Sequence, residues 1–338
     1  MKRIRMSTGI GAAIGMLLLI LDSKTALEGA AGGIDLCLKT VIPSLFPFFV
    51  LSILLTGAFT GQDIPLLRPL GRLFGVCPGA ESILLSGFLG GYPVGAQSIQ
   101  NACASGALEK AEGERMLAFC NNAGPAFLFG MAAALFPRAW MAWALWAIQI
   151  ASAWLVSRLF PSKSSAAIRL GSSKTVSLTD AVSAAARVMA GVCGWVVLFR
   201  VVLTFLNRWI FWILPATAQI ILAGILELSN GCCSLISVHN LGLRFLLCSG
   251  MLSFGGLCVG MQTWSAAPDL SKRLYFPGKT IQTCFSLLFA LGVQTLFPAD
   301  SRLADGPWLP LLALAVPAAV ILFRKREKSS SNPALLGV

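Results

Sequence analysis

Long apolar stretches, separated by short segments that hold most of the charged residues, limit the fold of this chain more than any other feature. Eight stretches have between 14 and 21 residues, close to the roughly 20 apolar residues that an α-helix needs to cross a bilayer. They are Thr8–Leu21, Val41–Phe59, Met116–Phe136, Trp140–Val156, Val188–Leu206, Phe245–Trp264, Thr280–Phe297 and Trp308–Phe323. We therefore expect an all-α polytopic membrane protein with about eight transmembrane helices.

Composition and charge exclude other classes of protein. Of the 338 residues, 56% are hydrophobic and 12% are charged, whereas a soluble domain has about 25% charged residues. The formal charge of +12 comes from Lys and Arg residues between the apolar stretches, the arrangement that is typical of cytoplasmic loops. We expect a lipid bilayer around this chain and no nucleic-acid partner.

The residues that usually carry enzyme chemistry are sparse. The ten cysteines form no C-x-x-C pair, and His239 is the only histidine in the sequence, so neither a zinc site nor a Ser-His-Asp triad is indicated. The sequence also contains no phosphate-binding loop and no dinucleotide-binding glycine motif. It predicts a protein that is not an enzyme and that has no metal site and no cofactor.

The first apolar stretch, Thr8–Leu21, follows three basic residues. This pattern is compatible with a signal peptide cleaved near Glu28–Gly33 and also with an uncleaved first helix. We favour the uncleaved helix, because the rest of the chain is predicted to lie in the membrane.

Two further apolar stretches, Ser82–Ile99 and Pro215–Val238, are interrupted halfway by glycine, proline and polar residues. Discontinuous helices of this kind enter and leave the membrane on one side in many solute transporters, where they present free backbone groups near the bilayer midplane. We predict two re-entrant broken-helix hairpins.

The distribution of positive charge supports this topology. With the N-terminus inside and both broken stretches returning to the side from which they came, most Lys and Arg residues lie inside, as the positive-inside rule requires. Lys272, Arg273, Lys279 and the basic tail are in this inside group. Both termini are then cytoplasmic.

The same topology contains an inverted repeat. Its sequence matches are L-x-G-x-L at Leu85–Leu89 and Leu222–Leu226, and R-x-L at Arg115–Leu117 and Arg244–Leu246. Such repeats place a binding site where the two broken helices meet. The predicted organisation is an N-terminal transmembrane helix (1–33), a first repeat (34–160), a cytoplasmic linker (161–187), a second repeat (188–298), and a C-terminal transmembrane helix with a basic cytoplasmic tail (299–338).

Two charged residues lie within apolar stretches. Glu227 is a candidate proton carrier or gate, and the alternative is a structural ion pair with Arg200, because an intramembrane carboxylate is costly unless it faces a cavity or a partner. Arg200 is a candidate contact for a carboxylate of the substrate, and the alternative is that its guanidinium extends to the outer membrane surface.

The breaks supply the remaining candidates for substrate binding. Asn121 and Asn122 precede Gly124 and Pro125, so we expect the helix to open there, and the two amides either bind substrate or join helices. The tip of the first hairpin, Gly90, Gly91, Tyr92, Pro93 and Gly95, permits close backbone approach, and Tyr92 either stacks on a flat ligand or packs at the turn. Candidates that rest on symmetry or on position alone are Ser229, Asn230, Gly231, Gln97, Gln100 and His239.

The sequence contains three distinctive motifs, GFLGGYPVGAQSI, ERMLAFCNNAGPAFLFG and AGILELSNG. Through these motifs, residues 8 to 325 resemble the YlbJ-like sporulation integral membrane proteins of the stage V sporulation type, which carry the nucleoside-recognition Gate domain. The resemblance implies a role in endospore formation. It also implies movement of dipicolinic acid from the mother cell across the outer forespore membrane, where this chain would then be located.

The leading hypothesis is therefore a transporter or channel for a small anionic solute, dipicolinate. The alternatives are a nucleoside or purine transporter coupled to H⁺ through Glu227, and a non-transporting scaffold for other sporulation membrane proteins. Besides the substrate and the bilayer, further copies of this chain and other sporulation membrane proteins stay open as partners.

Overall fold

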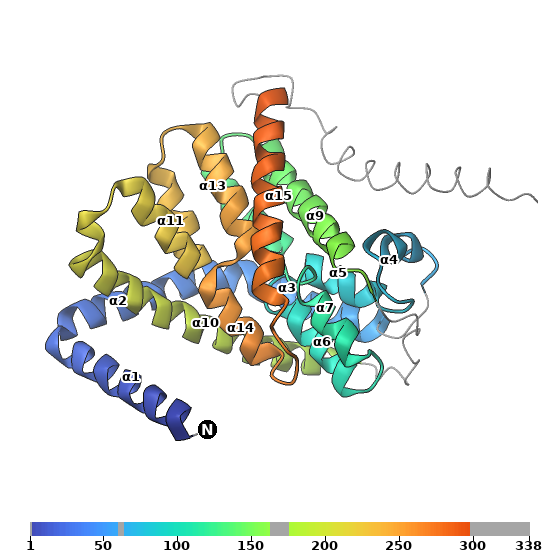
Figure 1. Cartoon of the computed structure of the whole chain (residues 1–338), viewed down its shortest axis with the longest axis horizontal. Coiled ribbons are helices and arrows are strands. Elements are labelled where there is room, and N and C mark those ends of the chain that lie inside the picture. Colours follow the sequence, from blue (N-terminus) through green and yellow to red (C-terminus); the bar gives the residue numbers. More distant parts are fainter. Residues whose placement is uncertain (1, 60–63, 163–175, 298–338) are drawn as a thin grey trace, which may run out of the picture.

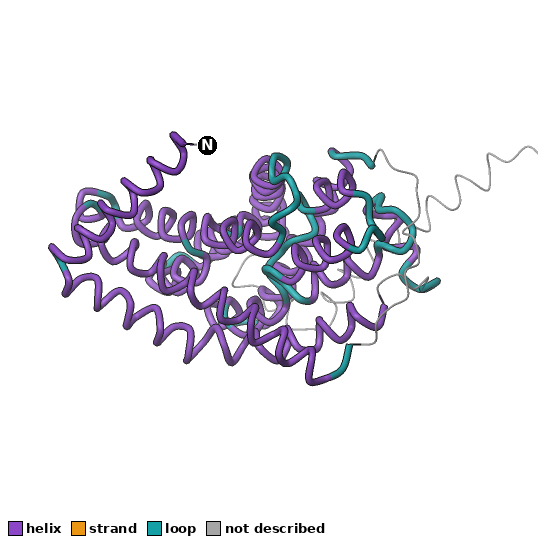
Figure 2. Tube along the Cα trace, turned by 90° about the horizontal axis from the view of Figure 1, so that it is seen from below, coloured by secondary structure: helices purple, strands orange, loops and turns teal. Residues whose placement is uncertain are grey.

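A computed structural model describes residues 2–59, 64–162 and 176–297 of the chain. Every regular element in these ranges is a helix, and no strand occurs among them (Figures 1 and 2). The expected all-α class is thus confirmed. The predicted C-terminal helix Trp308–Phe323 and residues 163–175 of the predicted linker lie outside the described residues.

Residues 2–59 form a bent helical rod. Helix α1 (Lys2–Leu21) turns sharply at Asp22 into α2 (Ser23–Leu36), and the π-helix η1 (Cys37–Val41) continues directly into α3 (Ile42–Phe59) (Figure 1). The chain thus crosses the predicted boundary between residues 33 and 34 without a break. Methyl groups on Gly29 and Gly33 would lie 2.8 Å from the Cα atoms of Val201 and Val197, so these glycines let α2 pack closely on the helix opposite.

The middle of the chain is divided into short helices. They are α4 (Arg68–Phe74), α5 (Glu81–Leu89), α6 (Val94–Ala104), α7 (Lys110–Met116), α8 (Pro125–Gly130) and η2 (Ala132–Leu135), and they are followed by the long α9 (Ala139–Leu159). The apolar stretch Met116–Phe136 is not one continuous helix, because α7 ends at Met116 and the helix restarts at Pro125. The physical reason is that Pro125 cannot donate a backbone hydrogen bond to the preceding turn.

The second half begins with α10 (Leu178–Trp209), which starts beside the Ser177 hydroxyl that accepts a hydrogen bond from the Asp180 N–H at 3.1 Å. The lead-in helix expected from Leu178 is therefore present, and it continues unbroken into the predicted span Val188–Leu206. The following helices are η3 (Phe211–Ile213), α11 (Ala216–Leu226), α12 (Leu228–Ser234), η4 (Leu235–Ser237), α13 (Leu241–Phe254), α14 (Gly256–Ala266) and α15 (Tyr275–Leu296).

The predicted span Phe245–Trp264 is also interrupted. Gly255 and Gly256 have φ angles of +81° and +82°, a conformation that glycine adopts without the steric cost that a side chain would bring. The break divides α13 from α14.

Four described helical segments are long and apolar enough to cross a membrane, namely Ser23–Phe59, Ala139–Leu159, Leu178–Trp209 and Leu241–Ala266. Shorter apolar helices cover Gly9–Leu21, Pro125–Leu135 and Ala216–Leu226. These segments support a helical membrane protein, while the total of eight spans stays a prediction.

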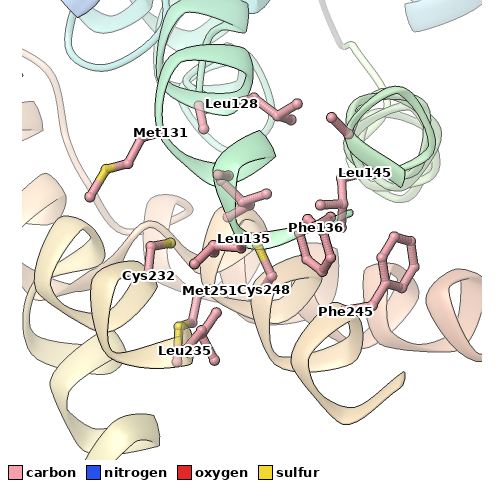
Figure 3. Packing of buried hydrophobic residues seen from close by; sticks show 14 of the residues in the cluster. Leu128, Met131, Leu135, Phe136, Leu145, Cys232, Leu235, Phe245, Cys248 and Met251 are labelled. Atoms are coloured by element: carbon pink, nitrogen blue, oxygen red, sulfur yellow. The ribbon is translucent and has the colours of Figure 1, made fainter. Parts of the chain in front are cut away.

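The two halves of the chain share one core. One core cluster contains Leu128 of α8, Leu135 of η2 and Met131 between these two helices (Figure 3). The same cluster contains residues of α12, η4 and α13, namely Cys232, Leu235, Phe245, Cys248 and Met251. Residues from opposite halves therefore exclude solvent and lipid from the same interior, and α9 closes the cluster through Leu145.

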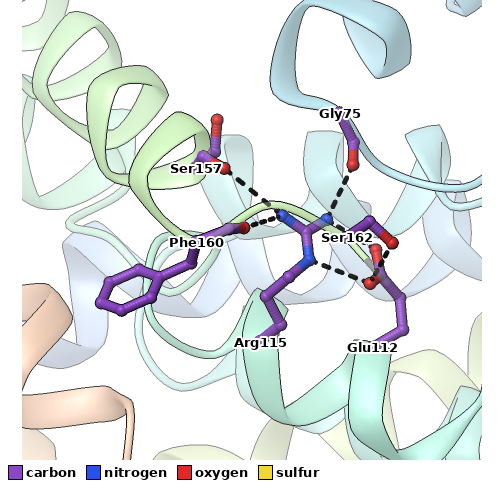
Figure 4. Close-up of polar contacts among 6 residues, drawn as sticks. All are labelled: Gly75, Glu112, Arg115, Ser157, Phe160 and Ser162. Atoms are coloured by element: carbon purple, nitrogen blue, oxygen red, sulfur yellow. Dashed lines mark hydrogen bonds and ion pairs between the residues drawn. The ribbon is translucent and has the colours of Figure 1, made fainter. Parts of the chain in front are cut away.

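A buried arginine anchors the short helices of the first half. Arg115 donates to both carboxylate oxygens of Glu112 at 2.9 and 2.6 Å, and to the carbonyl oxygens of Gly75 and Phe160 at 2.9 and 2.8 Å (Figure 4). Its side chain thus ties α7 to the end of α4 and to the end of α9. Arg244 joins helix ends in a similar way, since it donates to the carbonyl oxygens of Leu135 and Val238 at 2.7 Å each.

Candidate functional site

Four interruptions of helices meet in the middle of the described structure. They are Gly90–Pro93 between α5 and α6, Leu117–Gly124 between α7 and α8, Glu227 between α11 and α12, and Gly255–Gly256 between α13 and α14. We call this set of residues the central junction. The interruptions occur in the same order in both halves, a broken hairpin and then a broken helix, while the inverted repeat itself stays a prediction.

Glycines hold the interruptions against one another. A methyl group on Gly91 would lie 2.8 Å from Gly124 N, and one on Gly87 would lie 1.8 Å from the carbonyl oxygen of Cys120. A methyl group on Gly256 would lie 3.1 Å from the carbonyl oxygen of Gly224. Each hairpin therefore packs backbone to backbone on the interrupted helix that follows it.

Tyr92 connects the two halves at this junction. Its side chain is buried, and its hydroxyl donates to the carbonyl oxygen of Leu252 at 3.1 Å. The Tyr92–Pro93 peptide bond is cis. The phenol ring is therefore fixed between the tip of the first hairpin and the end of α13.

A cavity of about 30 Å³ lies between the two hairpins. Gly91, Tyr92 and Gly124 line it from the first half, and Glu227, Ser229 and Gln262 line it from the second. This volume has room for about one water molecule. The structure thus brings together predicted residues from both hairpins around one space, while substrate contact by these residues stays a prediction.

A larger cavity of about 210 Å³ adjoins the small one, since Val192 and Gln262 line both. Its wall includes Pro93, Gln97 and Arg187, together with the exposed Gly191 and Ser265. We call this space the vestibule. Gln97, predicted to be a polar group on the pathway, lies in its wall.

Glu227 is buried and caps its own helix. Its carboxylate accepts the backbone N–H groups of Ser229 and Asn230 at 3.0 and 2.6 Å, and the side-chain amide of Asn230 at 2.7 Å. The N–H groups of Ser229 and Asn230 at the start of α12 are therefore occupied by the protein's own carboxylate.

Arg200 reaches Glu227 indirectly. Its guanidinium donates to the side-chain oxygen of Asn230, and the amide nitrogen of Asn230 donates to Glu227. A methyl group on Gly32 would lie 3.4 Å from Arg200 Nε, so the side chain lies between α2 and α10. The residues that line the two cavities described above do not include Arg200.

Asn121 and Asn122 are buried, and they join the opened helix to the second half of the chain. Asn121 donates to the Thr263 hydroxyl at 2.8 Å. The Asn122 side-chain oxygen accepts from Lys279 Nζ at 3.0 Å and from Gln282 Nε2 at 2.9 Å. The helix opens at these residues as the sequence predicted.

Lys279 was missed by the sequence analysis, which counted it among the cytoplasmic loop residues. The structure places it in α15 with no exposed surface. A signal was present in the spacing of Lys279, Gln282 and Ser286, which repeats at the three- and four-residue intervals of one helix face and continues into the apolar stretch.

The remaining candidates lie outside the central junction. The Gln100 side-chain nitrogen donates to the Asp269 carboxylate at 2.8 Å, and the Gln100 side-chain oxygen accepts from the Asp269 backbone N–H at 3.3 Å. His239 is exposed. Gly95 and Gly231 act in packing, since methyl groups there would lie 2.5 Å from the carbonyl oxygen of Cys120 and 2.3 Å from Gly224 Cα.

Comparison with known proteins supports the resemblance drawn from the motifs. The chain is 24% identical over 324 aligned positions to the sporulation integral membrane protein YlbJ of Bacillus subtilis (strain 168), an alignment that covers 79% of this chain and 77% of that protein. The similarity to YlbJ-like proteins is thus confirmed. No family model matches the chain, and neither does any solved structure. The relative and the apolar helices together support an integral membrane protein that acts in sporulation.

Proposed function

Taking the similarity to a sporulation membrane protein as the premise, we propose that this chain transports a small anionic solute, dipicolinate, from the mother cell toward the forespore. The central junction and the vestibule form its pathway. The proposed location is the outer forespore membrane, with the described vestibule facing the cytoplasm of the mother cell.

The observation that carries this proposal is the meeting of four helix interruptions at one buried place. Interrupting a helix inside a bilayer leaves backbone groups without their usual partners, which costs several kcal/mol for each group that stays unsatisfied. Four such interruptions give no advantage to a protein that is only an anchor. They are useful where a polar solute must exchange its water for protein groups.

The two cavities support the same proposal. A vestibule of about 210 Å³ leads to an inner space of about 30 Å³, so a solute larger than water passes only after the hairpins or the interrupted helices move apart. This arrangement is compatible with alternating access, in which one group of helices rocks against the other around a central site.

The test is dipicolinate flux into proteoliposomes that contain the purified protein, with empty liposomes as the blank. We expect uptake that saturates with concentration and that unlabelled dipicolinate inhibits. No flux from a protein whose helix content and thermal transition are intact would refute transport. It would shift the assignment to the scaffold hypothesis.

A second candidate function has one specific observation in its favour. Glu227 is a buried carboxylate at the wall of the inner cavity, which is the position of a proton carrier in a nucleoside transporter driven by H⁺. Nucleoside uptake that collapses with a protonophore and with Glu227→Gln, in liposomes that take up no dipicolinate, would establish this alternative.

A further inference from the structure

The side chain of Lys279 lies fully buried beside the central junction, in the second turn of α15 and directly before the predicted span Thr280–Phe297. Its ammonium donates to Asn122 Oδ1 and to Gln282 Oε1, at 3.0 Å each, and lies 5.4 Å from the centre of the Tyr92 ring. All three partners are uncharged. Within the described residues, no carboxylate bonds to Lys279.

An ammonium ion in this position lacks the partner that usually makes burial tolerable. A charged side chain buried in a protein interior costs several kcal/mol, and such groups normally pair with an opposite charge. Two amide oxygens and a ring compensate part of this cost. One negative charge close to the ammonium would compensate the rest of the cost.

Neighbouring polar groups are also without partners. Asn121 Oδ1, the Tyr275 hydroxyl and both polar atoms of the Gln149 side chain are buried and make no hydrogen bond in the described structure. Tyr275 precedes Lys279 by one helical turn, Asn121 is next to Asn122, and the Gln149 carbonyl oxygen accepts from Gln282 at 3.3 Å. Buried polar atoms in native proteins are nearly always paired, so this group can accept a polar ligand.

Tyr92 lies between this group and the inner cavity. Its ring is part of the cavity wall and is also in contact with the Lys279 ammonium. Lys279 is not among the residues that line the inner cavity, so a solute reaches its ammonium only if the hydrogen bond from Tyr92 to Leu252 breaks and the ring moves aside. The ring face suits a flat aromatic ligand.

We infer that Lys279 is the cation that recognises a carboxylate of the transported solute, with Asn122 and Gln282 orienting its ammonium and Tyr92 stacking on the solute's ring. The substrate class is a planar aromatic carboxylate. This inference rests on the proposed function, and it moves the role of anion contact from Arg200 to Lys279.

The test compares binding of dipicolinate and of its neutral diamide to purified full-length protein, by titration calorimetry. Wild type is expected to prefer the dianion. Lys279→Met is expected to weaken dipicolinate binding by about ten- to a hundredfold, the value of a hydrogen bond to a charged group, and to remove the preference over the diamide. Lys279→Arg keeps the charge and is expected to retain a preference. Lys39→Met, at an exposed lysine paired with Asp35, is the matched control.

Stability separates recognition from a structural role. Because Lys279→Met replaces an uncompensated buried charge with an apolar side chain of similar length, its thermal midpoint is expected to be equal to that of wild type or higher. A lower midpoint, or unchanged dipicolinate binding, would overturn the inference.

The two proposals fail in different ways. If wild type binds and transports dipicolinate while Lys279→Met does so equally well, only the role of Lys279 is refuted. If folded wild type neither binds nor transports dipicolinate, the proposed function fails and the role of Lys279 fails with it.

Discussion

At the scale of single residues, buried charges divide into those that hold the fold and those that the fold leaves incomplete. Arg115 and Glu112 satisfy each other, and Arg115 also binds backbone carbonyl groups at two helix ends (Figure 4). Glu227 is satisfied by the start of α12 and by Asn230. Lys279 has hydrogen bonds but no counter-charge, which is why we assign it to ligand recognition.

The first prediction concerns Arg115. Arg115→Met should destabilise the protein by about 3–5 kcal/mol, because it leaves the Glu112 carboxylate buried without its partner. Chemical unfolding in detergent, followed by circular dichroism, measures this loss. The double variant Glu112→Gln/Arg115→Met should regain part of it. Lys39→Gln, at an exposed ion pair, should change stability by less than about 1 kcal/mol. Equal losses in Arg115→Met and Lys39→Gln would contradict the anchoring role.

The sequence identified Arg200 and Glu227 because a charge inside an apolar stretch is visible in the sequence alone. Lys279 could not be identified in this way, because it lies between the basic loop residues Lys272 and Arg273 and the apolar stretch that starts at Thr280. The positive-inside rule treats all three alike. Its burial depends on Tyr92 and Asn122, which are more than 150 positions away, and the polar spacing of Lys279, Gln282 and Ser286 marks one helix face without showing what covers it.

At the scale of helices, glycine decides where the chain can be interrupted and how closely the pieces pack. The breaks at Gly90–Pro93 and at Asn121–Pro125 follow from glycine and proline, and both were predicted. The break at Gly255 and Gly256 was missed, because two glycines in an apolar stretch are tolerated by many membrane helices. Their left-handed conformation and the close approach of Gly256 to the carbonyl oxygen of Gly224 distinguish them.

The second prediction tests this packing. Gly87→Ala should destabilise the protein by about 1–3 kcal/mol, because the new methyl group would overlap the backbone at Cys120 and force the hairpin away from the opened helix. Gly292→Ala in α15 is the control, since nothing lies within 4 Å of a methyl group there and alanine favours a helix over glycine. The measurement is the unfolding free energy of each variant. A neutral Gly87→Ala would show that the two backbones are not held in contact.

At the scale of the whole molecule, the halves form one unit. The core cluster takes side chains from both (Figure 3), and hydrogen bonds join Tyr92 to Leu252, Asn121 to Thr263 and Gln100 to Asp269. Any motion that opens the pathway must therefore break polar contacts between halves in addition to sliding apolar surfaces.

The third prediction concerns access of water to the vestibule. The background protein has serine in place of the four cysteines that are not fully buried, which are Cys103, Cys193, Cys233 and Cys284. Gly191→Cys lies in the vestibule wall and should react with a membrane-impermeant thiol reagent applied from the cytoplasmic side. Leu288→Cys, exposed on α15, should face lipid and stay unreacted. Mass spectrometry measures both modifications. Added dipicolinate should slow the modification of Gly191→Cys.

The outcome at Gly191→Cys bears on topology as well as on access. Reaction from the opposite side alone would reverse the proposed orientation, while absence of reaction from either side would contradict a vestibule that water reaches. The sequence predicted that a site would lie where the broken stretches meet. The volume of that site could not be predicted, because it depends on how side chains from both halves fill the space.

The narrowness of the inner cavity has a consequence for the cell that makes this protein. A membrane carries an electrochemical gradient of ions, and any continuous aqueous pore would discharge it. A space of about 30 Å³ bounded by Tyr92, Phe127, Leu228 and Val259 has room for about one water molecule, too little for a hydrated ion to pass. A cell can therefore hold many copies of this chain in a membrane and keep that membrane energised.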